Sequence, residues 1–278
     1  MNEKIKDYMF KIWLIVSTVT VLTIVLYLFG YIFKKGLSSI NLEFIFANPK
    51  GMPIGAEGGI FPAIVGSLLL TFIACLFASI LAISTSIYTL FYCQSKKVEN
   101  MIHLIVQSMA GIPSIVLGLF GYTLLVLHLR LGRSLLSGGI TLGIMIFPYI
   151  QIRVEKTLRE VDQNIIDSSY AIGVSKAYTI FKLILPLCKA EIISTITMAG
   201  GFAMGAAAPI ILTAAVIFAP IPKSLSAPVM ALPFHLYMLT GEGISLDKAY
   251  GTALVLILML LIINIIAAIF NMKKRDDQ

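Results

Sequence analysis

The hydrophobic pattern of this chain consists of long uncharged runs separated by short polar segments. Each run reaches the roughly 20 residues that a helix needs to cross the hydrocarbon core of a bilayer. Helices are expected there because they satisfy their own backbone hydrogen bonds in lipid. The pattern therefore predicts an all-α, polytopic membrane protein with six transmembrane helices, over Ile12–Phe33, Ile60–Tyr92, Met101–Leu129, Leu135–Ile152, Ile192–Ala219 and Ala249–Phe270.

Composition supports the bilayer as the environment of this chain. Of its 278 residues, 58% are hydrophobic and 13% are charged, and the mean hydropathy is +0.94. A soluble domain of this length does not bury that much apolar surface. We therefore expect a multi-pass protein of the cell (plasma) membrane.

The distribution of Lys and Arg predicts the orientation of the spans, because these residues are retained on the cytoplasmic side. If the N-terminus is cytoplasmic, most of the 21 basic residues fall on cytoplasmic segments. Both termini are therefore predicted to be cytoplasmic. The same distribution accounts for the net charge of +7 by membrane topology, so nucleic acid is not an expected partner.

One cytoplasmic connection, at about residues 153–189, is much longer than the others. Its pattern predicts two short helices separated by Gly173, which suits a positive φ at a helix end. Asp162 and Ser175 suit helix N-caps, and Pro186 is expected to mark a break before the next span. An amphipathic helix pair of this kind either lies in the lipid interface or docks into a groove on a cytoplasmic partner.

The string "DSSYAIGVSKAYTIFKLILP" resembles the cytoplasmic coupling loop of the permeases of type I ATP-binding cassette (ABC) importers. That loop has a Glu-Ala-Ala triplet, then a Gly, then a Leu-Pro ending. The matching residues here are Asp167, Ser168 and Ser169, then Gly173, then Leu185 and Pro186. The triplet is only approximated, whereas the Gly and the Leu-Pro are kept. The resemblance implies that this segment contacts an ATPase, with Tyr170, Ala171 and Gly173 as docking residues.

Further segments are similar to the Pst-type phosphate importer permeases, and to their PstA-type subunit in particular. They are "GGIFPAIVGSLLLT", "IPSIVLGLFGY", "FPYI" and "APVMALPFHLY". The resemblance implies a MetI-like permease core at residues 59–278, preceded by a transmembrane helix and an extracytoplasmic loop at residues 1–58.

The same resemblance implies the partners of this chain. They are a second homologous permease subunit, a homodimeric ABC ATPase and an extracytoplasmic substrate-binding protein that delivers phosphate. The chain has no Gly-x-x-x-x-Gly-Lys-Ser/Thr phosphate cradle, so ATP and Mg²⁺ are expected on the ATPase. No cofactor, catalytic residue or metal site is expected on this chain itself.

The segment "GGFAMGAAAP", from Gly200 to Pro209, departs from the family pattern. The family has an intramembrane Arg and Glu where this chain has Phe202 and Ala206. Gly201 and Gly205 have the Gly-x-x-x-Gly spacing of closely packed helices, and Pro209 favours a kink. Two interpretations stay open, a helix–helix seam and a hinge that lines the translocation path.

Two explanations fit the absence of the charged pair. The partner permease carries the anion-binding charges, while this subunit offers neutral donors such as Ser194, Thr197 and Thr213. Alternatively, the substrate is another oxyanion or a phosphorus compound. A non-conducting regulatory subunit is a further alternative, since an intramembrane Arg is costly and is kept for function.

Overall fold

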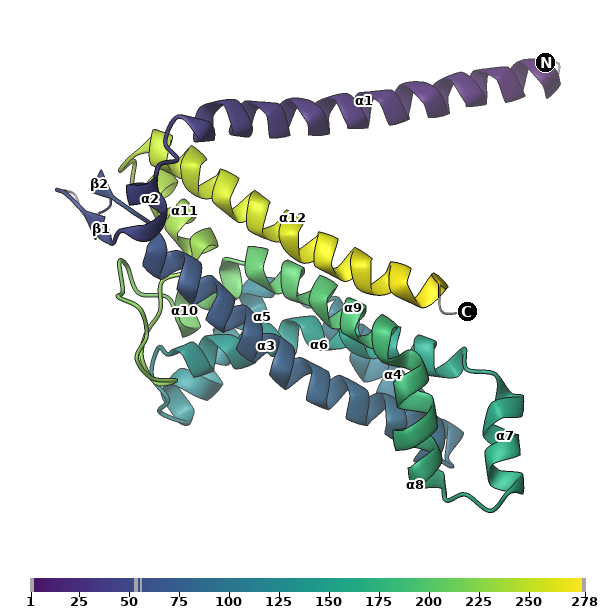
Figure 1. The fold of residues 1–278 in the computed structure, drawn as a ribbon. Coiled ribbons are helices and arrows are strands. Elements are labelled where there is room, and N and C mark those ends of the chain that lie inside the picture. Colours follow the sequence, from purple (N-terminus) through teal and green to yellow (C-terminus); the bar gives the residue numbers. More distant parts are fainter. Residues whose placement is uncertain (1–2, 53–54, 56, 277–278) are drawn as a thin grey trace.

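The protein is a bundle of helices, shown as a ribbon in Figure 1. The computed structural model describes residues 3–52, 55 and 57–276. In chain order the elements are α1 (Glu3–Leu37), α2 (Leu42–Phe46), β1 (Pro49–Lys50), β2 (Glu57–Gly58), α3 (Phe61–Ile87), η1 (Tyr88–Tyr92), α4 (Lys96–Ala110), α5 (Ser114–Gly121), η2 (Tyr122–His128), α6 (Leu135–Arg159), α7 (Gln163–Ala171), α8 (Lys176–Tyr178), η3 (Thr179–Ile184), α9 (Leu185–Gly205), α10 (Ala208–Thr213), α11 (Leu232–Gly241) and α12 (Leu246–Asp276). The segments η1, η2 and η3 are π-helical. The sheet of the described residues is one short antiparallel pair, β1 with β2, so the all-α class is confirmed.

Four helical segments are long and apolar enough to cross a membrane on their own, and each overlaps a predicted span. They cover Lys6–Leu37, Phe61–Tyr92, Leu135–Arg159 and Leu246–Ile269. A fifth crossing results if α4 is counted together with α5 and η2. Among the described residues this gives four or five crossings, where the sequence predicted six.

The predicted span Met101–Leu129 is not one straight helix. Its two parts, α4 and α5 with η2, meet at an angle of 101°. Pro113, just before α5, has extended backbone angles of φ −58° and ψ 137°. Proline lacks an N–H group and disfavours helical geometry in the residue before it, so the helix ends and restarts there. The expectation of a continuous span is corrected to a bent pair.

The predicted span Ile192–Ala219 is also interrupted. Its main helix, α9, begins earlier, at Leu185, and ends at Gly205. With 21 residues α9 is about 32 Å long, which is enough for the hydrocarbon core. Lys189 and Glu191 lie in its first two turns. After Gly205 the chain continues into the short helix α10.

The centre of the bundle is the long contact between α3 and α6. On α3, a stripe of small residues at every fourth position is fully buried, formed by Ala74, Ala78 and Ala82. On α6, Gly143 lies so close to α3 that an added Cβ would be 2.7 Å from Phe77 Cδ1. Small residues at this spacing let two helix backbones approach closely in a membrane. Helix α9 packs against both members of this pair, and α12 packs against α9.

Helix α1 stands apart from the bundle. Figure 1 shows it extending alone from the point where its last turns meet α12. At that contact, a Cβ on Gly36 would lie 2.6 Å from the carbonyl oxygen of Tyr250. The apolar window of Lys6–Leu37 has none of its residues buried within the chain. Such a helix needs lipid or another subunit as its neighbour. The division of the chain between residues 58 and 59 stays a prediction.

The two ends of the bundle differ. The strand pair, α2 and α11 lie at one end, while α7 and α8 lie at the other (Figure 1). The first residues of α1 and the last turns of α12 both point toward the end that holds α7 and α8. We call this end of the bundle the α7 end.

Candidate functional site

The helix pair predicted around Gly173 is present as α7 and α8. Asp162 Oδ1 accepts a hydrogen bond from Asn164 N at 2.9 Å and caps the N-terminus of α7. Gly173 has φ +80°, and the next amide, of Val174, donates to Ser169 O at 3.2 Å. This bond and the positive φ form a Schellman cap, which ends α7. Ser175 Oγ then caps α8 by accepting from Tyr178 N at 3.4 Å.

The break expected at Pro186 is absent. Helix α8, the π-helical η3 and α9 follow one another without a gap, and Thr179, Ile184 and Leu185 all have right-handed helical angles. Pro186 lies in the first turn of α9, where the absence of its N–H group costs least. The π-helical turns of η3, directly before it, shift the backbone hydrogen-bond register, so the helix continues past the proline. Figure 1 shows a bend at this junction in place of a break. Residues 176–205 thus form one continuous helical path.

The three residues that stand for the family triplet have different surroundings. Ser169 is buried, and its Oγ donates to Ile166 O at 2.7 Å and lies 3.0 Å from Thr179 Oγ1. It therefore ties α7 to η3. Asp167 is exposed and accepts from Gln163 Nε2 at 3.0 Å, and Ser168 is exposed as well.

The exposed side of α7 carries apolar side chains. Ile172 is 80% exposed and Tyr170 is 38% exposed, and Ala171 is exposed between them. A Cβ on Gly173 would meet nothing within 4 Å, so the surface is open there too. We call Tyr170, Ala171, Ile172 and Gly173 the tip surface. Apolar side chains gathered on a surface indicate a partner.

The last two residues of the expected coupling motif lie away from the tip surface. Leu185 and Pro186 line an apolar cavity of about 410 Å³ between α3 and the start of α9. Leu185 also packs against the buried core. These two residues therefore support the helix behind the tip and do not share its exposed surface.

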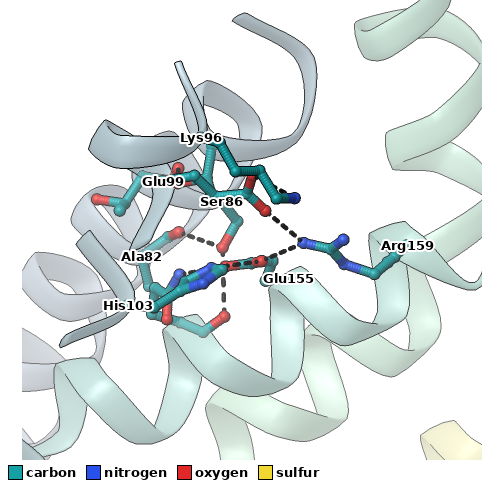
Figure 2. A network of polar contacts seen from close by, with 10 residues as sticks. Ala82, Ser86, Lys96, Glu99, His103, Glu155 and Arg159 are labelled. Atoms are coloured by element: carbon teal, nitrogen blue, oxygen red, sulfur yellow. Dashed lines mark hydrogen bonds and ion pairs between the residues drawn. The ribbon is translucent and has the colours of Figure 1, made fainter. Parts of the chain in front are cut away.

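A polar network joins α4 to the last turns of α6, directly before α7 (Figure 2). At its centre Glu155 is 7% exposed. Its carboxylate accepts from Gln151 Nε2 at 2.7 Å and from Arg159 Nη2 at 2.8 Å, and His103 Nε2 lies 2.9 Å from Oε1. Arg159 also reaches Glu99 Oε1 at 3.4 Å. Two elements far apart in the sequence are thereby fixed to each other beside the start of α7.

Sequence reasoning did not find this network. Gln151, Glu155 and Arg159 follow one another at intervals of four residues, so they lie on one face of α6. This spacing is visible in the sequence and was the signal that could have indicated part of the network. Their partner His103 comes from another helix, so only the fold brings them together. Ser86 of α3 adds a third helix, because its Oγ contacts Gln151 O at 3.3 Å (Figure 2).

The segment Gly200–Pro209 contains a helix break. Helix α9 ends at Gly205, Ala206 has extended angles of φ −84° and ψ 112°, and α10 begins at Ala208. Pro209 lies in the first turn of α10, where a proline is well tolerated. A kink was expected at Pro209. The helix is instead fully interrupted at Ala206, three residues earlier.

The small residues of this segment face different neighbours. A Cβ on Gly201 would lie 3.7 Å from Ile263 Cγ2, so Gly201 faces α12 of the same chain. A Cβ on Gly205 would meet nothing within 4 Å, and Phe202 is 64% exposed. Pro209 is buried. A Cβ added to Gly118 of α5 would lie 3.0 Å from the Cα of Pro209. Phe202 and Gly205 therefore lie on a surface of α9 that the described residues leave uncovered, with Ala206 half-buried beside them.

Comparison with known families gives one match. Residues 91–273 match the family described as binding-protein-dependent transport system inner membrane component. The matched region runs from η1 into the last turns of α12, and it includes α7 and α8, the network around Glu155 apart from Ser86, and the helix break.

Three relatives illustrate the similarity over most of the chain. The chain is 32% identical, over 93% of its own length and 91% of the relative, to the "Probable phosphate transport system permease protein PstA" of Methanocaldococcus jannaschii. It is 26% identical, over 96% of its length and 95% of the relative, to the "Probable ABC transporter permease protein YqgI" of Bacillus subtilis. It is 29% identical, over 80% of its length and 74% of the relative, to the "Phosphate transport system permease protein PstA 2" of Mycobacterium bovis.

Solved structures with a similar fold come from the MetNI methionine ABC transporter in inward-facing conformations. One crystal form gives a TM-score of 0.60 and covers 78% of this chain and 94% of that chain. Another gives 0.57 and covers 77% and 93%. The sequence identity is 16% in both cases, so this likeness concerns the fold alone.

The family match spans more than half of the chain, and the fold of the matched region is the MetI-like permease fold that the sequence resemblance implied. The relatives named as permeases cover nearly the whole chain. The chain belongs to the family of binding-protein-dependent transport system inner membrane components, the permeases of ABC importers.

Proposed function

We propose that this chain is a permease subunit of an ATP-driven importer of inorganic phosphate. The observation that carries the proposal is the similarity, over nearly the whole chain, to the relative from Methanocaldococcus jannaschii named as a phosphate transport system permease. In this proposal a second homologous permease completes the path, a homodimeric ATPase drives it, and an extracytoplasmic binding protein delivers the anion.

The tip surface is the contact with the ATPase in this proposal. Ile172 and Tyr170 are exposed at the end of a short helix whose base is fixed by the bonds of Ser169. A rigid short helix with apolar side chains at its end suits insertion into a groove of a partner. ATP and Mg²⁺ bind to the ATPase, and this chain supplies no group to them.

Movement at the tip reaches the membrane by two routes. The first is the continuous helical path of residues 176–205, which carries a displacement of α8 to the break at Ala206. The second is α6, whose last turn leads into α7 and is fixed to α4 by Glu155. Packed helices transmit such displacements as rigid bodies, and breaks between helices absorb them. The geometry supports alternating access with Gly205 and Ala206 as the hinge of this subunit.

The uncovered surface of α9 is the side that meets the second permease. Phe202 and Gly205 lie on it, and neither carries a charge. Burying a charge in the bilayer is costly, whereas apolar and small residues favour helix association. In this proposal the second permease therefore supplies the intramembrane charge that binds the anion, and this chain supplies the seam.

The α7 end faces the cytoplasm in this proposal, since the ATPase is cytoplasmic. Most of the basic residues lie on segments at that end, as the retention of Lys and Arg requires. Both termini are then cytoplasmic, because α1 begins and α12 ends toward the α7 end. The opposite end, with the strand pair and α2, receives the binding protein.

The test is uptake of radiolabelled phosphate by cells with and without this gene, in the presence of unlabelled competitors. Loss of uptake in the deletion strain, with competition by arsenate and none by sulfate, is the expected result. Unchanged phosphate uptake in the deletion strain would contradict the proposal. If uptake of a different oxyanion depends on the gene, that oxyanion is the substrate and phosphate is not.

A further inference from the structure

A polar cavity of about 340 Å³ lies between α6 and α9, toward the α7 end. From α6 it is lined by Arg153 and Lys156, and from α9 by Glu191, Thr195 and Met198. Thr195 is 5% exposed, and both basic side chains are exposed. The cavity is separate from the tip surface, and neither the resemblance nor the comparisons assign it a role. Lys156 also lines the neighbouring cavity beside the network centred on Glu155, whereas Arg153 does not.

The cavity continues the uncovered surface of α9. Thr195, Met198 and Phe202 follow one another at spacings of three and four residues, which places them on one face of the helix. Met198 is 37% exposed and Phe202 is 64% exposed. The face that carries Phe202 near the helix break therefore runs along α9 into the cavity. A solute that leaves the break along this face reaches Arg153 and Lys156.

The charges of the cavity suit an oxyanion that is held briefly. Arg153 stacks on Tyr149, with Cζ 5.0 Å from the ring centroid, and no carboxylate pairs with it among the described ion pairs. Lys156 contacts Glu160 at 3.7 Å, but both side chains are exposed, so the pair is weak. A guanidinium binds phosphate through two parallel N–H groups.

Glu191 limits how tightly the cavity holds an anion. It lines the cavity opposite the two basic residues, and it also has a polar or electrostatic interaction of its own. A transport path needs sites that attract the ion and still release it. A carboxylate facing the bases meets that requirement better than a cluster of bases alone.

We infer that this cavity is the exit site of the transported oxyanion on the cytoplasmic side, with Arg153 and Lys156 as its ligands. The inference rests on the proposed function and deepens it. The anion contact that is absent at Phe202 and Ala206 is made in this subunit at the cytoplasmic end of the same face of α9. Arg153 and Lys156 are then determinants of rate and charge selectivity, and not only anchors of a span end.

The experiment measures radiolabelled phosphate uptake by cells that carry the complete importer with variants of this chain, normalised to the amount of the chain in the membrane. The double variant Arg153→Gln with Lys156→Gln is expected to lower the maximal rate about tenfold, the scale of one lost charge-assisted hydrogen bond. The phosphate concentration at half-maximal uptake is expected to stay unchanged, because capture occurs at the other end. Arg153→Lys should retain most of the rate, and Arg153→Glu should lower it more than Arg153→Gln does.

Lys97→Gln is the matched control, since Lys97 is an exposed base near the α7 end that does not line the cavity. Uptake by the double variant equal to that of Lys97→Gln would overturn the inference while leaving the proposed function intact. An equal loss with Arg153→Lys and Arg153→Glu would overturn it too, since a site for an anion depends on the sign of the charge. Absence of phosphate uptake with the unmodified chain would instead defeat the proposed function and the inference with it.

Discussion

The residues of the segment 167–186, which contacts the ATPase in the proposed function, fall into two groups with different physical roles. Ser169 points inward and bonds to Thr179, so it sets how α7 sits on the helix behind it. Ile172 points outward and makes its contact only when a partner is present. Substitutions in the first group are expected to affect folding, and substitutions in the second group to affect assembly.

Ile172→Glu is expected to release the ATPase without unfolding the permease. The side chain is 80% exposed, so its replacement removes little packing within this chain. At the interface it would bury a charge, and truncation of a central apolar contact commonly costs more than 1 kcal/mol of binding. The measurement is the amount of ATPase that copurifies with the permease in detergent.

Leu42→Glu is the matched control for this substitution. Leu42 is 77% exposed, but it lies on α2 at the opposite end of the bundle. It should retain the ATPase in full. Equal retention by both variants would show that the tip surface is not the docking site.

Gly173 is expected to tolerate Asn and to reject Val. Its φ of +80° is strained for side-chain-bearing residues, least for Asn and most for β-branched residues. A Cβ there would meet nothing within 4 Å, so any loss comes from the backbone angle and not from a clash. Phosphate uptake and the membrane level of the two variants test this, and equal uptake by both would refute the role of the Schellman cap.

At the scale of elements, the network around Glu155 decides how α4 lies against α6. Glu155 is buried and is shared by Arg159 of its own helix and His103 of α4. Loss of the carboxylate removes the buried charge that Gln151, Arg159 and His103 share, although Arg159 keeps its contact with Glu99.

Glu155→Gln is expected to destabilise the solubilised protein by about 1–3 kcal/mol, the cost of a lost charge-assisted bond in a buried site. The melting temperature should fall by several degrees. Glu160→Gln on the same helix is the control, since its pair with Lys156 at 3.7 Å is exposed and contributes about 0–1 kcal/mol. A melting temperature of Glu155→Gln as high as that of Glu160→Gln would contradict the structural role of the network.

Some elements were predictable from the sequence because their signals are local. The caps at Asp162, Gly173 and Ser175 and the apolar runs of the four long helices follow from residue type and spacing. The 101° bend before Pro113 was not predicted, because a proline inside an apolar run permits either a kink or a break, and tertiary packing chooses. Pro186 shows the opposite outcome, since a π-helical segment lets the helix continue past it.

At the scale of the whole molecule, the surfaces that the chain leaves uncovered point to its assembly. Within the part of the chain that the structure describes, helix α1 has no neighbour over most of its length, and the face of α9 with Phe202 is open. The spacing of Gly201 and Gly205 predicted a single packing face. Their neighbours depend on where α12 lies, so the sequence alone did not show that Gly201 is used within the chain and Gly205 is not.

Phe202→Cys is expected to form cross-links with a cysteine on the second permease, in a cysteine-free background. The side chain is 64% exposed on the uncovered face of α9. Gly201→Cys, one position away, is the control, because it faces Ile263 of the same chain at 3.7 Å. Cross-linking is read as a shift on a denaturing gel. Efficient cross-linking of Gly201→Cys, or none of Phe202→Cys, would place the seam on another face.

The most direct test of the central claim is phosphate transport by the purified complex in proteoliposomes. The complex that copurifies with this chain is reconstituted with its binding protein outside the vesicles and ATP on the side of the ATPase. The account predicts that radiolabelled phosphate accumulates only with ATP, and that Ile172→Glu abolishes accumulation. Accumulation without ATP, or unchanged accumulation by Ile172→Glu, would contradict a permease driven through the tip surface.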